Sequence, residues 1–95
     1  MKSIIDEGSQ QCFNCGANRS VGLHVHHIFF GPNRKNSEKY GLKVKLCYIC
    51  HEDNKKGVHG LNIELKERLF RIGQQAFERD HTREEFMAIF GKNYL

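Results

Sequence analysis

The stretch LKVKLCYICH, residues 42–51, changes its pattern halfway along. Its first half alternates apolar residues with lysines, which is typical of a strand with one buried face. Its second half begins at Cys47 and spaces two cysteines three positions apart. A helix is predicted to start there, to run through YICHEDNKK and to stop near Gly57. The stretch therefore predicts a strand that passes through a pair of thiols directly into a helix.

A second pair of cysteines with the same C-x-x-C spacing precedes this stretch. Cys12 and Cys15 form that pair, and with Cys47 and Cys50 they account for all 4 cysteines of the chain. Two such turns can arrange four thiolates tetrahedrally around Zn²⁺, with Zn–S bonds of about 2.3 Å. The alternatives are a redox-active pair or free buried cysteines. Redox pairs are usually single and belong to a thioredoxin-like order of elements, which this sequence lacks. The four cysteines are therefore predicted to hold a structural Zn²⁺.

Length and composition agree with one small domain stabilised by a metal. The chain has 95 residues, of which 39% are hydrophobic and 27% charged, so a modest core is expected. We divide the single domain 1–95 into a lead-in over 1–11, a metal-bound core over 12–59 and C-terminal helices over 60–95. No secretion leader or membrane span is recognised, so we expect a cytoplasmic protein with reduced thiols and no membrane partner. The net charge of +4 favours a polyanionic partner such as nucleic acid.

The remaining pattern predicts a second strand and two further helices. VGLHVHHIFF, residues 21–30, is rich in β-branched and aromatic residues and indicates a strand. The turn-rich residues 31–41 then form a loop, so that the two strands make a long hairpin. Apolar residues at helical spacing predict an amphipathic helix over 61–77. Thr82 and Glu85 form a capping box that begins a last helix, REEFMAIF. The predicted fold class is α+β.

Histidines form a second group of metal-compatible residues. Three of them lie in the predicted first strand, and His51 directly follows the last cysteine. If the helix lies across the strands, His51 faces the end of the first strand, near His26 and His27. Neutral imidazoles can hold a divalent cation and leave positions for water and a phosphate oxygen. His24 is interpreted as a strand-surface residue and His81 as a residue near a helix end.

Together these motifs resemble a known family. The combination CxxC, HHIFFG and LCYICH resembles the HNH (ββα-metal, or His-Me finger) endonucleases. More narrowly, HHIFFGPNRKNSEKYGLKVKLC, GVHG and the tail REEFMAIFGKNYL resemble small phage-encoded, Ref-like recombination-enhancement nucleases. The resemblance covers Cys12 to Leu95. It implies a zinc-stabilised ββα-metal domain with two additional C-terminal helices. It also implies a phage or prophage enzyme that acts on DNA in a bacterial host, with a RecA-type recombinase filament as a partner.

The resemblance also implies roles for individual histidines. It makes His27 the general base and makes His26 and His51 ligands of a catalytic divalent cation, which can be Mg²⁺, Mn²⁺, Ni²⁺ or Zn²⁺. His59 is the candidate third ligand, because many relatives carry a second histidine downstream of the first helical one. The family's asparagine usually stands in an NL pair, and here that place reads GL at residues 41–42. Its candidate replacements are Asn33 and Asn36.

Basic residues concentrate between the two strands and on the second one. They are predicted to contact phosphates without reading bases, and the alternative is a solvated charged surface. The set comprises Arg34, Lys35, Lys43 and Lys45, with Lys39 beside them. The first functional hypothesis is a metal-dependent DNA endonuclease with little sequence specificity. The second is a catalytically inactive, zinc-stabilised nucleic-acid-binding module, and the third is a zinc-held protein-interaction adaptor. The adaptor leaves the histidines without a role.

Overall fold

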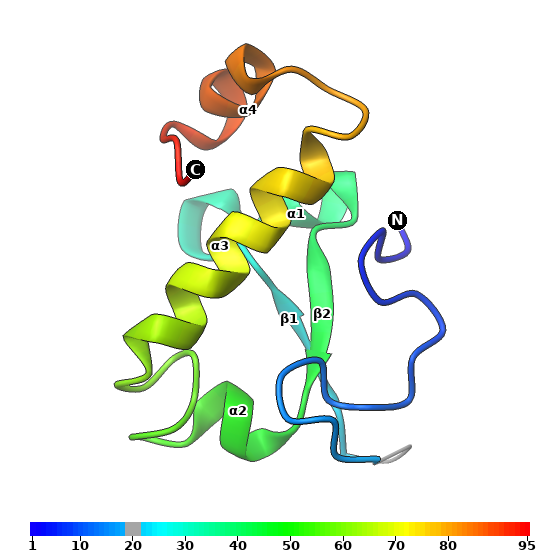
Figure 1. Cartoon of the computed structure of the whole chain (residues 1–95), viewed down its shortest axis with the longest axis vertical. Coiled ribbons are helices and arrows are strands. Elements are labelled where there is room, and N and C mark those ends of the chain that lie inside the picture. The colour runs from blue at the N-terminus through cyan, green and yellow to red at the C-terminus, as the bar shows by residue number, and fades with distance from the viewer. Residues whose placement is uncertain (19–21) are drawn as a thin grey trace.

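A hairpin of two short strands organises this computed structural model, which describes residues 1–18 and 22–95. Strand β1 (His24–His27) pairs antiparallel with β2 (Lys43–Leu46), and the two lie side by side in Figure 1. Both predicted strands are present, but each is shorter than its sequence pattern suggested. Val21, the first residue of the predicted first strand, lies outside the described residues. The fold is a small mixed α+β fold with a two-stranded sheet.

The register of the hairpin determines which way each histidine faces. Along β1 the pairs are His24 with Leu46, Val25 with Lys45, His26 with Val44 and His27 with Lys43. Because side chains alternate across a strand, His24 and His26 share one face, and His27 belongs to the other. The face of His26 carries the buried side chains of β2, which alternate with its lysines as predicted.

The segment between the strands is helical, which corrects the predicted loop over 31–41. A 3₁₀ turn (Gly31–Asn33) leads into helix α1 (Arg34–Tyr40). The only proline lies in the first turn, where its missing N–H costs no hydrogen bond. Ser37 is fully buried, and its Oγ donates to the Phe29 carbonyl oxygen at 2.7 Å and accepts from the Phe29 N–H at 3.0 Å. Local sequence propensity carries no information about this tertiary contact, so the loop prediction was wrong.

Helix α2 (Tyr48–Glu52) begins at the predicted place but ends earlier than predicted. Asp53 leaves the helical conformation, and its carboxylate accepts the backbone N–H groups of Lys55 and Lys56 at 3.1 and 3.0 Å. An aspartate that binds the backbone of the next residues favours a turn over a continued helix. The chain therefore leaves α2 in a tight loop.

The two C-terminal helices agree with the sequence pattern. Helix α3 (Ile63–Phe77) covers the predicted range to within two residues, and α4 (Arg83–Phe90) is the predicted last helix. The capping box is confirmed, because the Thr82 side chain accepts from the Glu85 N–H and Glu85 binds back to the Thr82 backbone. Gly91, with a φ of +84°, ends α4 in the left-handed conformation that glycine adopts without strain.

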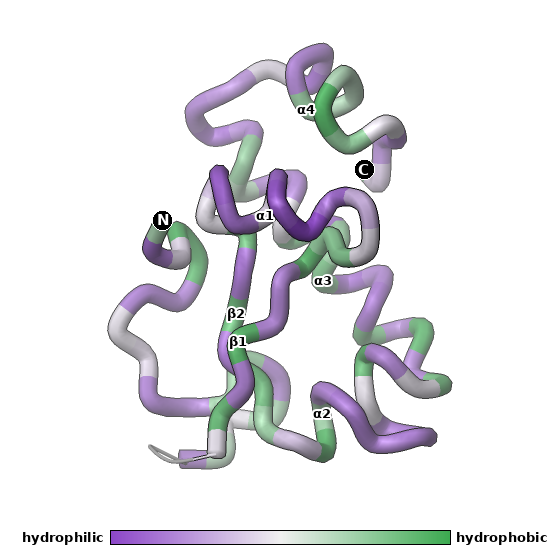
Figure 2. The backbone as a smooth tube through the Cα atoms, turned by 180° about the vertical axis from the view of Figure 1, so that it is seen from behind, coloured by the Kyte–Doolittle hydropathy of each residue, from purple (hydrophilic) through white to green (hydrophobic). Residues whose placement is uncertain are grey.

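Helix α3 crosses one face of the hairpin, as Figure 1 shows. At the crossing, a Cβ on Gly73 would lie 2.9 Å from the Phe29 ring and 3.0 Å from Ile28 Cγ2. Glycine therefore permits the close approach of α3 to the end of β1. The hydropathy trace in Figure 2 shows α1 as a strongly hydrophilic helix, in contrast to the hydrophobic parts of α4.

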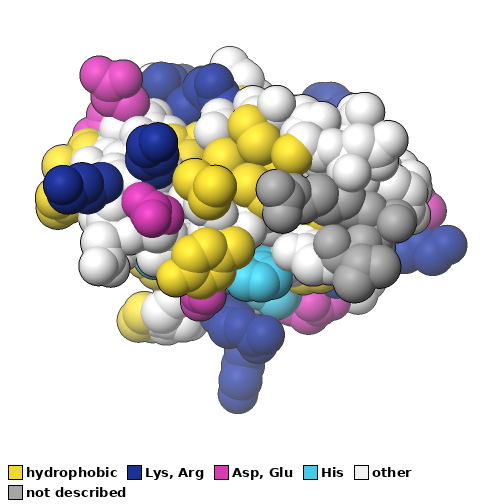
Figure 3. All heavy atoms as spheres, turned by 90° about the horizontal axis from the view of Figure 1, so that it is seen from below, with side chains coloured by type: hydrophobic (Ala, Val, Ile, Leu, Met, Phe, Trp, Pro, Cys, Tyr) yellow, Lys and Arg dark blue, Asp and Glu magenta, His cyan; other side chains and the backbone are white. Residues whose placement is uncertain are grey.

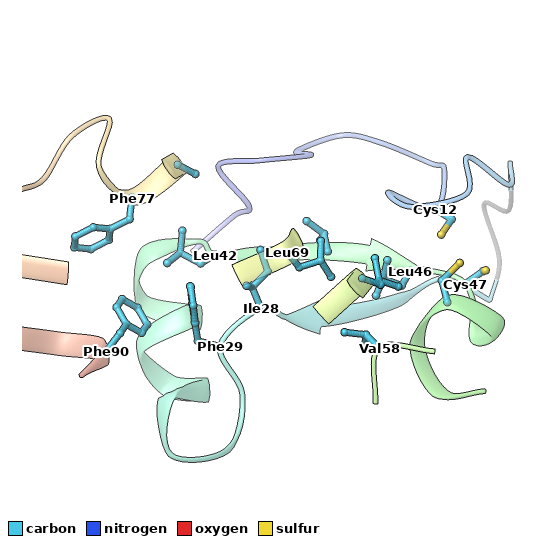
Figure 4. Close-up of a cluster of buried hydrophobic side chains, with 14 of the residues drawn as sticks. Cys12, Ile28, Phe29, Leu42, Leu46, Cys47, Val58, Leu69, Phe77 and Phe90 are labelled. Carbon is cyan, nitrogen blue, oxygen red and sulfur yellow. The ribbon is translucent and has the colours of Figure 1, made fainter. Parts of the chain in front are cut away.

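The core runs the length of the hairpin. Figure 4 shows Phe77 and Phe90 at one end, Ile28, Leu42 and Leu69 in the middle, and Cys12 and Cys47 at the other end. Burial of each such aliphatic or aromatic side chain stabilises the fold by about 1.5–3 kcal/mol. The cysteines lie at the end of this row that lacks large buried side chains. A metal bound there would stabilise that end of the core.

The N-terminal segment is bound to β2, whereas a loose lead-in was predicted over 1–11. Ser3 Oγ donates to the Lys43 carbonyl oxygen at 2.6 Å, and the Asp6 carboxylate accepts the Lys45 N–H at 2.8 Å. These bonds satisfy the outer edge of β2, which would otherwise expose unpaired backbone groups. Among the described residues, no helix combines the length and the apolar character that crossing a membrane requires.

Candidate metal centres

The two C-x-x-C turns meet at the far end of the hairpin, as predicted. One sulfur from each of Cys12, Cys15, Cys47 and Cys50 lies within 4.8 Å of the others, and all four are free thiols. The Cys15 and Cys47 sulfurs are 3.8 Å apart. A tetrahedral ion with Zn–S bonds of about 2.3 Å requires sulfurs about 3.8 Å apart. The four cysteines therefore lie close enough to hold a structural metal such as zinc.

The surroundings of two of these thiols shift their pKa values in opposite directions. Burial opposes the ionisation of Cys12, but surrounding backbone N–H groups outweigh it and lower its pKa to about 6. Burial also raises the pKa of Cys50 to about 12, and Asn14 Nδ2 donates to its sulfur at 3.3 Å. A bound dication stabilises thiolates, so it would overcome the burial that keeps Cys50 protonated. Arg68 of α3 in turn donates to Asn14 Oδ1 at 2.6 Å.

The histidines form a separate centre. One ring nitrogen from each of His26, His51 and His59 lies within 4.8 Å of the others. His26 comes from β1, His51 from α2 and His59 from the loop that follows α2. Their ring centroids are 4.8 to 5.2 Å apart. The structure thus brings together the three histidines that the sequence analysis assigned to a catalytic cation.

His26 is the most deeply buried histidine of this cluster. Its ring is 1% exposed, and among the described residues its Nε2 is the buried side-chain nitrogen or oxygen without a hydrogen-bond partner. Leaving such an atom unpaired costs about 1–3 kcal/mol. Burial, and then the neighbouring His51 and His59, lower the pKa of His26 to about 3. At neutral pH the ring is therefore uncharged, and its lone pair is available to a cation.

The eight-residue spacing between His51 and His59 is explained by the loop after α2. The His59 N–H donates to the His51 carbonyl oxygen at 3.1 Å, and the Val58 N–H donates to the Cys50 carbonyl oxygen at 2.8 Å. These bonds fold the loop back over α2. A Cβ on Gly60 would collide with backbone atoms of the same loop, so glycine is required for the turn. Sequence spacing alone does not show this return.

His27 faces a different set of groups from His26. Its Nε2 lies 2.8 Å from Glu38 Oε1, and its ring is 9% exposed. Glu38 also accepts from Lys43 Nζ at 2.9 Å and from the N-terminal ammonium group at 2.8 Å. The hydrogen bond from His27, followed by those from the ammonium group and Lys43, holds the pKa of Glu38 well below its usual range. A carboxylate that is ionised at neutral pH therefore contacts His27.

Glu38 was missed by sequence reasoning. Residues 31–41 were interpreted as a loop, so no helical phase was available to place Glu38 toward the strands. The asparagines considered there have another role. Asn33 Nδ2 donates to the Phe90 carbonyl oxygen at 3.3 Å, and Asn36 Nδ2 donates to that of Ile89 at 3.5 Å. Both amides thus hold the end of α4, and Glu38 is the residue that contacts His27.

His24, interpreted as a strand-surface residue, is half-buried on β1 and also contacts His51. Its Nδ1 lies 2.9 Å from His51 Nδ1, and the two rings meet edge to face. His24, His51 and Glu52 also offer ligand atoms within 4.8 Å of one another. His81 lies after the end of α3, as predicted, and stacks on Phe77 with a centroid distance of 4.4 Å. Its other aromatic neighbour is Tyr40, and it does not line the pocket of the clustered histidines.

The predicted basic residues separate into two groups. Arg34 lines a pocket of about 270 Å³. The other lining residues are Val25, Phe30 and four histidines, His26, His27, His51 and His59. Lys35 is exposed on the same helix as Arg34. Lys43 Nζ is bound to Glu38, and Lys45 Nζ donates to the Ser9 carbonyl oxygen at 2.6 Å.

Figure 3 shows histidine side chains reaching the surface at the α2 end of the molecule, beside exposed hydrophobic side chains.

No family model, curated protein or solved structure matches the chain. Its function is therefore inferred from its own residues. Three clustered imidazoles, a histidine hydrogen-bonded to a carboxylate and a guanidinium line one pocket. This set of groups can bind a divalent cation, accept a proton and contact an anionic oxygen.

Proposed function

We propose that the protein is a metal-dependent DNA endonuclease of the HNH type with little sequence specificity. The observation that carries the proposal is the buried, unpartnered Nε2 of His26, in a pocket that also contains His27 and Arg34. A protein that only binds DNA or another protein has no need of an unsatisfied imidazole at this depth. A cation ligated there would give the atom a partner.

The cation site would consist of His26, His51 and His59. Their three imidazoles leave further coordination positions for water and a phosphate oxygen, as a catalytic site requires. A divalent cation bound there supplies positive charge to the scissile phosphate and to the leaving oxygen. The four cysteines offer no open position, so their zinc would only stabilise the fold.

His27 is the proposed general base. With its Nε2–H donated to Glu38, its lone pair lies on Nδ1, and this nitrogen can take a proton from the attacking water. The ionised carboxylate of Glu38 then stabilises the imidazolium that forms, as in other histidine–carboxylate pairs. Water oxygen bonds to phosphorus as the bond to the 3′ oxygen breaks. The products are a 5′-phosphate and a 3′-hydroxyl, which takes up the proton that balances the reaction.

Arg34 would contact the phosphate; in support, it lines the same pocket as His27. A guanidinium can bind two phosphate oxygens at once, which would orient the backbone for in-line attack. Exposed Lys35 would extend the backbone contact without reading bases. Lys43 and Lys45 would add to it only where DNA displaces their partners within the protein. DNA is thus the proposed partner, and a RecA-type recombinase filament in phage recombination is the further partner that the sequence resemblance implies.

One observation favours the inactive nucleic-acid-binding module as a second candidate. His27 is only 9% exposed, so little solvent reaches its ring. The endonuclease remains the better proposal because His27 nevertheless lines the same pocket as the three clustered histidines. A binding module also leaves the three-histidine cluster without a role.

Cleavage of supercoiled plasmid in the presence of Mg²⁺, Mn²⁺, Ni²⁺ or Zn²⁺ tests the proposal. We expect nicking with at least one of these cations, and two bound metals per chain after loading. His26→Ala should lose the second metal together with activity, whereas His81→Ala, a histidine outside the pocket, should retain both. A zinc-loaded protein that binds DNA but cleaves with none of the four cations would support the inactive module instead.

A further inference from the structure

His24 and His51 form a contact that the proposed reaction does not use. Their Nδ1 atoms are 2.9 Å apart, and their ring centroids are 5.1 Å apart at an angle of 76°. His24 lies on the same face of β1 as His26, so it approaches the three-histidine cluster from the neighbouring strand position. The contact therefore adjoins the cation site at its helical ligand.

Only one proton can lie between these two nitrogens. A neutral imidazole has one N–H and one lone pair, on opposite ring nitrogens. If His51 donates Nδ1–H to His24, the His51 lone pair lies on Nε2 and remains free for a cation. If His24 donates instead, the His51 lone pair is used at Nδ1, and its Nε2 carries a hydrogen that prevents ligation. The direction of this hydrogen bond thus decides whether His51 can bind a metal.

We propose that His24 is a positioning residue that accepts the Nδ1–H of His51 and so presents His51 Nε2 to the cation. Ligating histidines commonly donate their second ring nitrogen to an acceptor that fixes both tautomer and ring orientation. Here the acceptor would be a neighbouring imidazole, in place of the more common carboxylate or carbonyl oxygen. The inference rests on the proposed cation site for its functional meaning.

The alternative is that His24 itself ligates a cation, with His51 Nδ1 and Glu52. Metal–nitrogen bonds of about 2.0–2.1 Å at a tetrahedral ion place two ligand nitrogens about 3.3 Å apart. The observed 2.9 Å is shorter and matches an N–H···N hydrogen bond. Glu52 is also exposed and so would bring a hydrated carboxylate. The hydrogen bond is therefore the better interpretation.

Variants at His24 test the proposal in protein that holds one equivalent of zinc. His24→Asn places Oδ1 at the same number of bonds from Cα as His Nδ1, so it keeps an acceptor. His24→Leu removes the acceptor and keeps the bulk. We expect His24→Leu to weaken Co²⁺ binding about 10–100-fold in calorimetric titration, and His24→Asn to stay within about threefold of the parent. His81→Leu is the matched control and should bind Co²⁺ as the parent does.

A second readout needs no added cation. Nitrogen-15 NMR of the histidine rings should show His51 protonated on Nδ1 in the parent and in His24→Asn, and a mixture of tautomers in His24→Leu. Equal Co²⁺ affinity in the parent and His24→Leu would overturn the proposal, as would a failure of His24→Asn to restore affinity. Loss of one ligating nitrogen from Cu²⁺-loaded His24→Leu, seen by electron paramagnetic resonance, would make His24 a ligand. If the parent binds no added cation, the proposed function fails, but the tautomer of His51 still tests the role of His24.

Discussion

Nε2 of His27 lies 2.8 Å from Oε1 of Glu38, so a hydrogen bond joins β1 to α1. In the proposed reaction, this contact would give α1 a chemical role in addition to its structural one. Glu38 balances the charge of Lys43 on the neighbouring strand as well. Because that carboxylate stays ionised, a protonated His27 would be stabilised where it forms.

Replacement of the pair should separate chemistry from binding. His27→Ala is expected to reduce the cleavage rate about 10²–10⁴-fold, because a positioned base is lost. Glu38→Gln should reduce it about tenfold or more, since the amide cannot stabilise the imidazolium as a carboxylate does. Single-turnover cleavage measures both rates, and fluorescence anisotropy measures DNA affinity, which should be unchanged. Glu84→Gln, at an exposed position on α4, is the control. Full cleavage by His27→Ala would sink the assignment of the base.

Loss of one thiol should open the cysteine site. Cys12→Ser or Cys47→Ser is expected to release the bound zinc and to unfold the domain or lower its melting temperature sharply, because three thiolates no longer close the tetrahedron. Metal analysis and circular dichroism record the two effects. Ser9→Ala, outside the cysteine cluster, is a suitable control. A serine variant that keeps its zinc and its native melting temperature would contradict the structural role of the metal.

The burial of His26 predicts a dependence of stability on pH without added catalytic cation. Its pKa is about 3 in the folded protein and near 6.5 when unfolded, so the unfolded chain binds more protons between these values. Stability should therefore fall as pH decreases from about 6.5 toward 3, by at most about 1.4 kcal/mol per pH unit from this group.

Urea unfolding of the parent and of His26→Asn measures that dependence. The zinc site also loses stability in acid, but it contributes equally to both proteins, so the difference between them isolates His26. The asparagine variant should show the flatter curve over this range. Parallel curves would mean that His26 becomes protonated in the folded state at an ordinary pKa.

The salt dependence of DNA binding should distinguish the two groups of basic residues. Arg34→Ala with Lys35→Ala is expected to reduce the slope of log K against log salt by about two, one for each phosphate contact removed. Lys43→Ala with Lys45→Ala should change it less, because both ammonium groups already have partners within the protein. Anisotropy titrations at several salt concentrations measure the slopes. A larger effect of the β2 lysines would mean that DNA displaces their internal partners.

Much of the architecture could be predicted from local pattern. Alternation of apolar residues identified β2, helical spacing identified α3, and the Thr82–Glu85 pair located the start of α4. The repeated C-x-x-C spacing was enough to predict a single cluster of four thiols, because each turn leaves its two sulfurs facing one point. These features depend on residues close in sequence, where propensity and spacing are informative.

Helix α1 was not predicted from local pattern. Its composition is that of a turn, and the buried hydroxyl of Ser37, bonded to Phe29 across the fold, is what secures it. Only this helix presents Glu38 to His27. The N-terminal segment is a similar case, because its bonds to β2 link residues about forty positions apart.

For the candidate site, the sequence by itself determined which residues can ligate metal or accept a proton: four cysteines in two turns, and histidines clustered around one strand and the start of one helix. The tertiary structure decided how they combine. Backbone hydrogen bonds of the loop after α2 bring His59 next to His51. Hydrogen bonds join His27 to Glu38 and His24 to His51. The physical reason is that residue type fixes chemical capacity, whereas ligand geometry and hydrogen-bond partners depend on contacts between segments that no local pattern specifies.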